Sequence, residues 1–309
     1  MKSALLLIRT PFQARLALAV LRVEDVTSYD LVYVTRHDSA EDRYYSDRLG
    51  HSAQRCVYEH LTPARIDSLQ IHYRITSLKR RLQREYNLII LASIDEIVFA
   101  WAVRNIKSSA VVSIDDGTAN YAMAGNYFRD NFSVRGKALR WLNGSASAPD
   151  IRKQIDRHYT PNPEFENIVE KARVKHIDVF GNAGRTRGEG KVSFFIGCPI
   201  EEALNGELLS RYRDAIANLS VDYYVRHPRE NSAALLDAAI LDKKGRIAED
   251  AIIDIAQGRN IELFGWISSV MLNLRGPRFE KNVYLPKDFV STSDYSRLAK
   301  SADCRVHLF

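Results

Sequence analysis

The first structural unit of the chain begins with Ala4-Leu5-Leu6-Leu7-Ile8-Arg9-Thr10-Pro11-Phe12-Gln13. Its first five residues are apolar without alternation, which is typical of a strand buried on both faces of a parallel sheet. Pro11 predicts a helix that continues over Phe12–Leu21, because proline is tolerated in the first helical turn. A strand that leads directly into a helix is the repeating unit of open α/β folds.

The same alternation continues through the first half of the chain. We predict further buried strands at Leu31–Thr35, Leu88–Ala92 and Val111–Ile114, and helices at Ile75–Tyr86 and Glu96–Ile106. Such an alternation, with right-handed crossovers, gives a parallel sheet with helices on both faces. The region Tyr127–Val174 differs, since it is basic and helical in pattern, with an apolar and aromatic cluster at Ala138–Leu142.

A second α/β series follows the glycine-rich stretch Gly181–Gly190, which is typical of a flexible linker. Its predicted strands are Val192–Ile196, Asp222–Val225, Ile261–Phe264, Val283–Leu285 and Arg305–Leu308. Its predicted helices are Glu201–Asn218, Ser232–Leu241, Ala248–Gln257, Ser268–Leu274 and Thr292–Ser301. We therefore expect two open parallel-sheet, Rossmann-like domains, residues 1–185 and 191–309. They would face a central cleft, where nucleotide-dependent enzymes commonly place their chemistry.

Length and composition agree with a globular protein of two domains. The chain has 309 residues, of which 46% are hydrophobic and 27% charged. No apolar run approaches the roughly 20 residues that cross a bilayer. The three cysteines, Cys56, Cys198 and Cys304, are too few and too far apart for a disulfide framework or a zinc site. We therefore expect a cytoplasmic protein.

The net charge of +6 allows an anionic substrate or an anionic membrane surface as a partner. Nucleic acid is not expected, because the aromatic residues are scattered rather than interleaved with a basic stripe. The basic segment Arg129–Lys153 is a candidate for peripheral contact with an anionic membrane or a lipid-linked acceptor. A solvated helical face, or a subunit interface as in a homodimer, explains the same pattern.

The richest candidate site is Tyr223-Tyr224-Val225-Arg226-His227-Pro228-Arg229-Glu230. A histidine, a proline and two arginines follow a short strand-forming run, where parallel sheets deliver their ligand contacts. Such a group is suited to binding a phosphate and to giving it a proton as it leaves. A surface turn with a solvated charge cluster is the alternative.

A second candidate is Asp115-Asp116-Gly117, at the end of the strand Val111–Ile114. Two adjacent carboxylates cannot both enter an apolar core without a large cost, so at least one faces a cleft or a polar partner. Gly117 permits a tight turn or a close approach of the backbone to a ligand. A carboxylate at this place suits general-base catalysis on a substrate hydroxyl, and a helix N-cap is the alternative.

Three other segments could contact an anionic or nucleotide ligand. Ser268 and Ser269 follow an apolar strand and open a helix, which suits an anion site or a plain pair of N-cap residues. Glu249 begins another helix, where it could hold a ribose or a base amine or simply complement the helix dipole. Gly197 could let the chain pass close to a nucleotide, and Glu201 would face the cleft. Cys198 is expected to be a buried small side chain, since no histidine lies near it in sequence.

The chain has neither a Walker-type phosphate loop nor an Asp-x-Asp pair for a metal–nucleotide complex. We therefore expect a mechanism without metal or cofactor.

Taken together, these segments resemble the bacterial lipooligosaccharide sialyltransferase family. The family's carboxylate-carboxylate-glycine motif matches Asp115-Asp116-Gly117, its His-Pro motif matches His227-Pro228, and its paired-serine motif matches Ser268-Ser269. The opening Arg9-Thr10-Pro11-Phe12-Gln13 is also similar to the start of this family. Order and spacing agree from residue 4 to about residue 286. Each motif is short, but four of them in order on the expected strand ends are fairly specific.

The resemblance implies a fold of the GT-B kind and an inverting transfer of sialic acid from CMP-sialic acid to a glycan hydroxyl. It implies that Asp116 is the base and that His227 stabilises or protonates the departing phosphate, which Ser268 and Ser269 hold. Glu249 would bind the cytidine portion. The other residues expected to bind substrate are Thr10, Asp115, Gly117, Gly197, Glu201, Pro228 and Arg229.

Two questions stay open at this level. Asp115 and Asp116 both fit the role of base, and Glu201 is a rival. Transfer of another sugar by a related GT-B enzyme, such as glucose from a uridine donor, and non-catalytic binding of a nucleotide sugar are the alternative functions.

Overall fold

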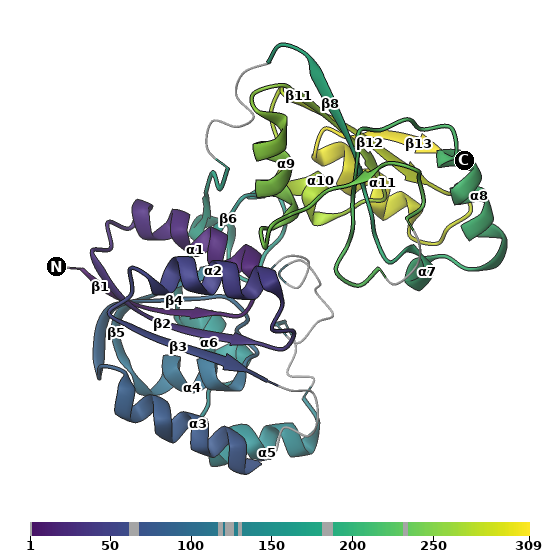
Figure 1. Ribbon diagram of the computed structural model, residues 1–309. Coiled ribbons are helices and arrows are strands. Elements are labelled where there is room, and N and C mark those ends of the chain that lie inside the picture. Colours follow the sequence, from purple (N-terminus) through teal and green to yellow (C-terminus); the bar gives the residue numbers. More distant parts are fainter. Residues whose placement is uncertain are drawn as a thin grey trace. The chain divides into compact units, whose positions relative to one another are not determined.

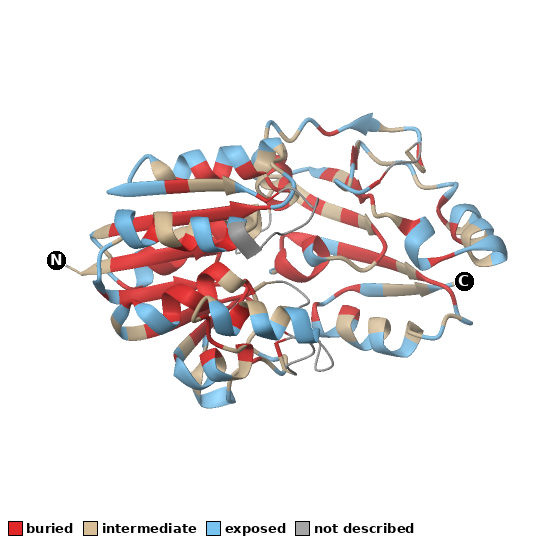
Figure 2. Cartoon of the chain, turned by 90° about the horizontal axis from the view of Figure 1, so that it is seen from below, coloured by how far each residue is buried: buried red, intermediate tan, exposed pale blue. Residues whose placement is uncertain are grey.

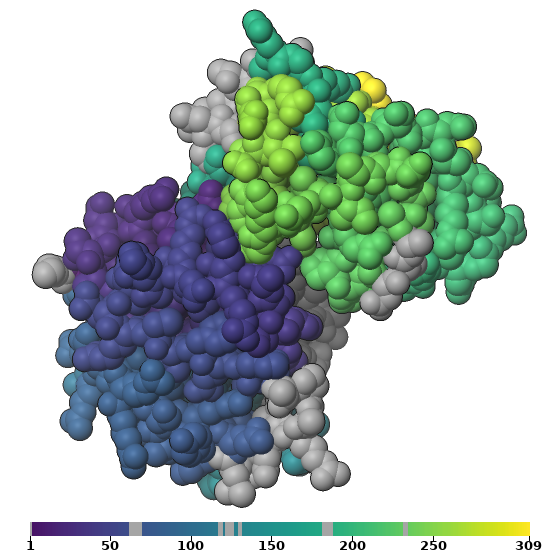
Figure 3. Space-filling model, in the orientation of Figure 1, coloured from purple at the N-terminus to yellow at the C-terminus, as the bar shows by residue number. Residues whose placement is uncertain are grey.

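The computed structural model describes residues 2–61, 68–116, 120, 127–128, 132–180, 188–230 and 234–309. The chain divides into two compact units, Met1–Val179 and Phe180–Phe309 (Figure 1). The boundary between the units, after Val179, lies before the predicted one, since the predicted domains are residues 1–185 and 191–309. In the space-filling view, purple and blue surface belongs to the first unit and green and yellow surface to the second (Figure 3). Most of the predicted linker, residues 181–187, lies outside the described residues.

The first unit contains a sheet whose described strands run in the order β3-β2-β1-β4-β5-β6-β7, all parallel. The strands are β1 (Ser3–Ile8), β2 (Ser28–Thr35), β3 (Arg55–His60), β4 (Glu85–Leu91), β5 (Lys107–Ile114), β6 (Ile155–Thr160) and β7 (Val174–His176). The order reverses between β1 and β4, which is the point where open α/β sheets bind ligands.

Helices cover both faces of this sheet. They are α1 (Pro11–Val23), α2 (Ala40–Gly50), α3 (Ser68–Arg81), α4 (Ile97–Asn105), α5 (Val134–Leu142), α6 (Ala148–Gln154) and the 3₁₀ turn η2 (Lys171–Arg173). Helices α1 and α2 pack together on one face, and α3, α4 and α6 lie on the other (Figure 1). The buried strands and the exposed outer helix faces are visible in Figure 2. Residues Ala4–Ile8 are fully buried, as the apolar run predicts.

The second unit repeats this architecture with six described parallel strands in the order β10-β9-β8-β11-β12-β13. The strands are β8 (Lys191–Ile196), β9 (Tyr223–Val225), β10 (Ala239–Ile240), β11 (Asn260–Gly265), β12 (Phe279–Leu285) and β13 (Arg305–Leu308). The helices are α7 (Ile200–Ala203), α8 (Gly206–Ile216), α9 (Ala248–Ala256), α10 (Ser269–Asn273) and α11 (Thr292–Ser301). Each unit has its own apolar core. The expectation of two open parallel-sheet, Rossmann-like domains is confirmed.

Some predicted helices are wrong in detail. The predicted helix Ile75–Tyr86 ends at Arg81, because Tyr86 already belongs to β4. The predicted helix Glu201–Asn218 is split into α7 and α8 by extended residues before Gly206. The described part of Ser232–Leu241, residues 234–241, is irregular and ends in the edge strand β10, because pairing with β9 replaces helical hydrogen bonds.

Other elements were not predicted at all. Helix α2 and strand β3 are largely polar, so neither carries the apolar signal of the other elements. The region Tyr127–Val174, expected to be helical, also supplies strand β6 and the start of β7. Strand β6 is hydrogen-bonded to β5, and this pairing outweighs its polar sequence. No helix in the described ranges combines the length and the apolarity that a bilayer span requires.

Glu24, at the end of α1, fixes this helix to the sheet. Arg157 of β6 donates two hydrogen bonds to its carboxylate, at 2.5 and 2.6 Å. The Tyr159 hydroxyl and the Lys2 ammonium also donate to it, at 2.8 and 2.9 Å. The Arg157 hydrogen bonds lower the pKa of Glu24 to about 2, against the opposing effect of burial. The charged form of Glu24 therefore stabilises the attachment of α1.

We expect Glu24→Gln to lower the free energy of unfolding by about 2 kcal/mol at pH 7, because a charged acceptor with four donors is lost. The folded-state pKa of Glu24 is depressed. Its contribution is therefore present above the ordinary value of 4.5 and disappears as the pH falls toward 2. Urea titrations of both proteins between pH 7 and pH 3 measure this difference.

The matched control is Asp294→Asn, which breaks an exposed ion pair with Arg297. It should change stability by less than about 0.5 kcal/mol. A difference for Glu24→Gln that does not depend on pH would contradict the assignment.

Candidate functional site

The carboxyl edge of the first sheet brings together residues from three neighbouring strands. Strand β1 leads to Arg9 and Thr10, β4 leads to Ser93, and β5 leads to Asp115 and Asp116. In a parallel sheet all such ends lie on one edge, so residues far apart in sequence become neighbours. The predicted position of Asp116 at a strand end is thereby confirmed.

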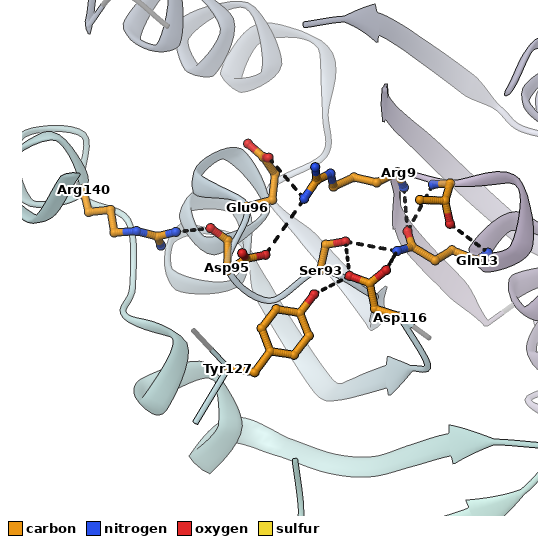
Figure 4. A network of polar contacts seen from close by, with 9 residues as sticks. Arg9, Gln13, Ser93, Asp95, Glu96, Asp116, Tyr127 and Arg140 are labelled. Carbon is orange, nitrogen blue, oxygen red and sulfur yellow. Dashed lines mark hydrogen bonds and ion pairs between the residues drawn. The ribbon is translucent and has the colours of Figure 1, made fainter. Parts of the chain in front are cut away.

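The Asp116 carboxylate is partly exposed and is held by three neutral donors (Figure 4). The Ser93 hydroxyl donates to Oδ2 at 2.7 Å, and the Tyr127 hydroxyl donates to the same oxygen. The Gln13 side-chain amide donates to Oδ1. The backbone N–H of Asp116 is also occupied, since it donates to Asn120 Oδ1 at 2.7 Å. The carboxylate thus has a fixed orientation with no cation bonded to it among the described residues.

Asp115 has a different environment from Asp116. It is 1% exposed, and its carboxylate is bonded to His158 Nε2 at 2.9 Å and to the Thr160 hydroxyl at 2.7 Å, both on β6. Its side chain therefore joins β5 to β6 inside the fold. Of the two adjacent carboxylates, that of Asp116 is partly exposed and that of Asp115 is buried. A substrate contact of Asp115 stays a prediction that its burial does not support, and Gly117 lies outside the described residues.

Thr10 is the N-cap of α1, where its hydroxyl accepts from Gln13 N at 3.3 Å. Gln13 returns the contact, because its Oε1 accepts from Arg9 N at 2.7 Å and from Thr10 N at 3.3 Å. This reciprocal arrangement is a capping box. It places Thr10 beside the Asp116 network, and its predicted contact with substrate remains a prediction.

Charged and titratable neighbours surround the Asp116 network. Arg9 lies 3.9 Å from the carboxylate of Asp95 and 3.8 Å from that of Glu96. Burial raises the pKa of Asp95, and the negative charge of Asp116 adds to this effect, while Arg9 opposes it. Burial and Asp116 raise the pKa of Tyr127 well above its ordinary value. Tyr127 therefore keeps its proton and acts as a donor to Asp116.

In the second unit, His227 lies in a tight loop just past β9. The backbone N–H of His227 donates to Glu230 Oε2 at 3.1 Å, and the backbone N–H of Glu230 donates to the His227 carbonyl at 3.0 Å. The Tyr224 hydroxyl donates to the other oxygen of Glu230, which is 6% exposed. The buried carboxylate thus fixes the loop to the strand that precedes it.

The imidazole of His227 is held in a defined protonation state. The N–H of Arg229 donates to His227 Nδ1 at 3.1 Å, so the proton of the neutral ring lies on Nε2. Burial lowers the pKa of His227, and the charges of Arg229 and Lys243 lower it further. His227 therefore presents a neutral Nε2–H donor.

Gly197, just past β8, lies directly against the His227 loop. A Cβ at this position would approach Glu230 Oε2 to 2.4 Å and the Val225 carbonyl oxygen to 3.0 Å. Gly197 N also donates to that carbonyl at 2.9 Å. The close approach that glycine permits here is to the protein itself, and contact with a nucleotide remains a prediction.

The paired serines and Glu249 are joined through α10. Ser268 is the N-cap of this helix and accepts from Met271 N at 3.4 Å, and Ser269 is exposed at its start. Asn273, the last residue of α10, donates to Glu249 Oε1 at 2.9 Å. Burial raises the pKa of Glu249, which is 4% exposed. Because α10 has only five residues, the hydroxyls and amide groups rather than a long helix dipole would hold an anion.

Three predicted positions lie on the surface of the second unit. Glu201 on α7 is exposed and lies 3.3 Å from Arg213. Arg229 is exposed and pairs with Glu202 at 2.8 Å, and Pro228 is exposed beside it. Cys198 is mostly buried, and burial raises the pKa of its thiol to about 12, which disfavours a nucleophilic thiolate as expected.

Sequence reasoning missed several residues that shape these sites. Gln13 carries the capping-box pattern with Thr10, but that pattern gives no sign of its contact with Asp116. Ser93 follows a predicted strand and could have been found by the strand-end rule. No sequence signal points to Tyr127, or to Lys281, whose buried ammonium donates to two carbonyls at the end of α10. No cluster of metal-binding side chains occurs among the residues that the structure describes.

The chain matches the family model described as glycosyltransferase family 52 over residues 30–286. It is 25% identical over 201 residues to N-acetyllactosaminide alpha-2,3-sialyltransferase of Haemophilus influenzae. That match covers 64% of this chain and 64% of the relative, so the chain spans less than two thirds of the relative's length. Among solved structures, the glycotransferase of kitacinnamycin shows 12% identity and a TM-score of 0.48, covering 99% of this chain and 86% of that one. Acinetobacter baumannii MurG shows 10% identity and a TM-score of 0.43, covering 100% and 86%.

We expect Gly197→Ala to lower the free energy of unfolding by about 1–3 kcal/mol, because the new methyl group displaces Glu230 or strains the backbone. Urea denaturation measures the loss, and NMR of the His227 ring reports the altered loop.

The control is Gly136→Ala within α5, where the nearest atom lies 3.4 Å from the added Cβ. Alanine is the better helix former, so this variant should be as stable as the wild type or slightly more stable. Equal effects at both positions would contradict the close approach at Gly197.

Proposed function

Because the chain belongs to glycosyltransferase family 52, we propose that it is an inverting sialyltransferase. It moves sialic acid from CMP-sialic acid to the hydroxyl of a terminal galactose-type sugar in a lipooligosaccharide or capsular glycan. The name of the Haemophilus influenzae relative, N-acetyllactosaminide alpha-2,3-sialyltransferase, supports sialic acid as the transferred sugar. One observation carries the proposal: within the matched range, Asp116, His227 and Ser268 each follow a strand at the carboxyl edge of its sheet.

The first unit supplies the base in this proposal. Asp116 accepts the proton of the acceptor hydroxyl while the oxygen attacks the anomeric carbon of sialic acid. The bond from that carbon to the phosphate oxygen of CMP breaks on the opposite side, so the configuration inverts. Asp116 suits this role better than Asp115, whose carboxylate is occupied by His158 and Thr160. Glu201, paired with Arg213 on the surface, is the weaker rival.

The second unit binds the donor in this proposal. The strands β9, β8 and β11 are neighbours, so His227, Gly197 and the paired serines follow adjacent strand ends. His227 donates its Nε2 proton in a hydrogen bond to the departing phosphate, and Ser268 and Ser269 donate to the other phosphate oxygens. Glu249 binds the cytidine portion. A neutral imidazole stabilises the leaving phosphate as a hydrogen-bond donor, so the reaction does not require an imidazolium.

Helix α5 is the proposed place of peripheral membrane contact. Its exposed apolar residues are Val134, Ala138, Trp141 and Leu142, which recur at a helical spacing of four, three and one. Arg135 and Lys137 are exposed on the same helix, which has no acidic residue. On the inner side, Arg140 is buried and donates to the Ala146 carbonyl at 3.0 Å. An apolar stripe with tryptophan, flanked only by cations, is typical of a helix that lies on an anionic bilayer.

We also propose a cytoplasmic location, because Cys56, Cys198 and Cys304 are free thiols.

Incubation with CMP-sialic acid and a galactose-terminated acceptor should release CMP and form a sialylated product. Asp116→Asn and His227→Ala should each lower kcat by about 10²–10⁴-fold, as expected for groups that act in the transition state. His176→Ala, at an exposed histidine of β7, is the control and should keep wild-type turnover. Thermal melts verify that each variant is folded.

Two results would redirect the proposal. Turnover with another nucleotide sugar but none with CMP-sialic acid would overturn the donor. An affinity change alone in His227→Ala, without any turnover in the wild type, would indicate a binding protein.

Membrane contact is measured by co-sedimentation with vesicles that contain phosphatidylglycerol. The double variant Trp141→Glu/Leu142→Glu should bind the vesicles at least about tenfold more weakly than the wild type, because two apolar anchors are replaced by negative charges. Val290→Glu, at a residue that is 90% exposed in the second unit, should bind like the wild type. Unchanged vesicle binding together with lost self-association would assign the α5 face to a homodimer interface instead.

A further inference from the structure

Ser93 has a backbone conformation that is unusual for its residue type. It lies just past β4 with φ at +38°, in the left-handed region that favours glycine. Serine has no advantage there as a backbone element, because its Cβ makes that region costly. Residues held in such conformations concentrate at functional sites, where the surrounding structure keeps them in place. The side chain of Ser93 therefore needs an explanation.

Ser93 is 1% exposed, and the polar contacts described for its hydroxyl lie within the Asp116 network. The Ser93 hydroxyl donates to Asp116 Oδ2 at 2.7 Å and accepts from Gln13 Nε2 at 3.0 Å (Figure 4). Glycine would adopt the backbone conformation without strain, but it would lose both hydrogen bonds. We infer that Ser93 is a positioning residue whose strained backbone is retained so that its hydroxyl, with Gln13 and Tyr127, aims the Asp116 carboxylate. This inference rests on the proposed role of Asp116 as the base.

Gln13 gives the network its direction. Its Oε1 accepts from two backbone N–H groups at the start of α1, at 2.7 and 3.3 Å, so the amide cannot turn around without losing both. Its Nε2 must then face Ser93 and Asp116, and both of its N–H groups are used there. Gln13 is fully buried, so water does not compete for these positions. The Ser93 hydroxyl accepts from this amide, so its own proton is left for the hydrogen bond to Asp116.

The donors are distributed unequally over the two oxygens of Asp116. Oδ2 accepts from both Ser93 and Tyr127, which occupies its two lone pairs. Among the described residues, Oδ1 accepts from Gln13 alone. In the proposed reaction, the O–H bond of the acceptor sugar breaks and its proton goes to Oδ1. The freed electron pair of that hydroxyl forms the new glycosidic bond.

Aiming matters because proton transfer requires a defined approach. A misplacement of about 1 Å in a reacting group can lower a rate by about 10²-fold. Without the Ser93 hydroxyl, Oδ2 loses one of its two donors, and the carboxylate is held by Gln13 and Tyr127 alone. We expect the chemical step to slow, while binding of the donor is unchanged, because the residues proposed to bind CMP-sialic acid all belong to the second unit.

The test compares Ser93→Gly with Ser93→Ala. Both variants lose the hydroxyl, but only glycine relieves the backbone strain, so Ser93→Gly should melt about 2–4 °C above Ser93→Ala. Both should show kcat lowered about 10–100-fold, with the KM for CMP-sialic acid unchanged. If Ser93→Gly is more stable than Ser93→Ala and yet equally slow, lost stability does not explain the loss of kcat. The control is Asp25→Gly, which removes a left-handed non-glycine residue at the exposed end of α1 and should keep wild-type kcat.

Each outcome bears on a separate claim. Wild-type kcat in Ser93→Gly would overturn the positioning role, and a melting temperature no higher than that of Ser93→Ala would overturn the strain. Asp116→Asn tests the underlying function separately. If that variant keeps full turnover, Asp116 is not the base, whatever the melting temperatures show.

Discussion

Parallel pairing of short buried strands is the constraint on which the rest of this structure depends. In the first unit, β1 pairs with β2 on one side and β4 on the other, in a register that places Leu7 opposite both Val32 and Leu91. Because all strands point the same way, whatever follows them emerges at one edge. The second unit obeys the same rule around β8. The candidate site residues therefore follow the strand ends, while central strands such as β1 form an apolar core.

Both units hold one carboxylate at this edge in the same way. A carboxylate is held by hydroxyl and amide donors rather than by a full ion pair: Asp116 in the first unit and Glu230 in the second. Neutral donors fix orientation without burying a second charge, which would cost several kcal/mol of desolvation. Charged pairs such as Arg229–Glu202 stay at the surface. The first unit therefore presents the Asp116 carboxylate in a fixed orientation, and the second unit presents the His227 ring on a fixed loop.

The sequence predicted the parts that depend on local pattern. Apolar runs such as Ala4–Ile8 and Val192–Ile196 predicted the central strands. The positions of Asp116, His227 and Ser268 just after other predicted strands made them candidate site residues. Polar elements such as β3 and β6 were missed, because their stability comes from pairing with neighbours rather than from their own composition. The choice between Asp115 and Asp116 also could not be made, since it depends on β6, which supplies His158 and Thr160. Contacts between distant segments, such as Gln13 with Asp116, leave no trace in either segment alone.

Gln13 joins two properties that are usually independent. The same amide closes the first turn of α1 and holds the carboxylate of Asp116, so the order of that turn and the orientation of that acid are physically coupled. Fraying of the helix start would release the acid, and a ligand that rearranges the acid would loosen the helix start. Amide hydrogen exchange at the beginning of α1 would then respond to a change at Asp116, just past β5. Asp116 lies 103 residues after Gln13 in the sequence.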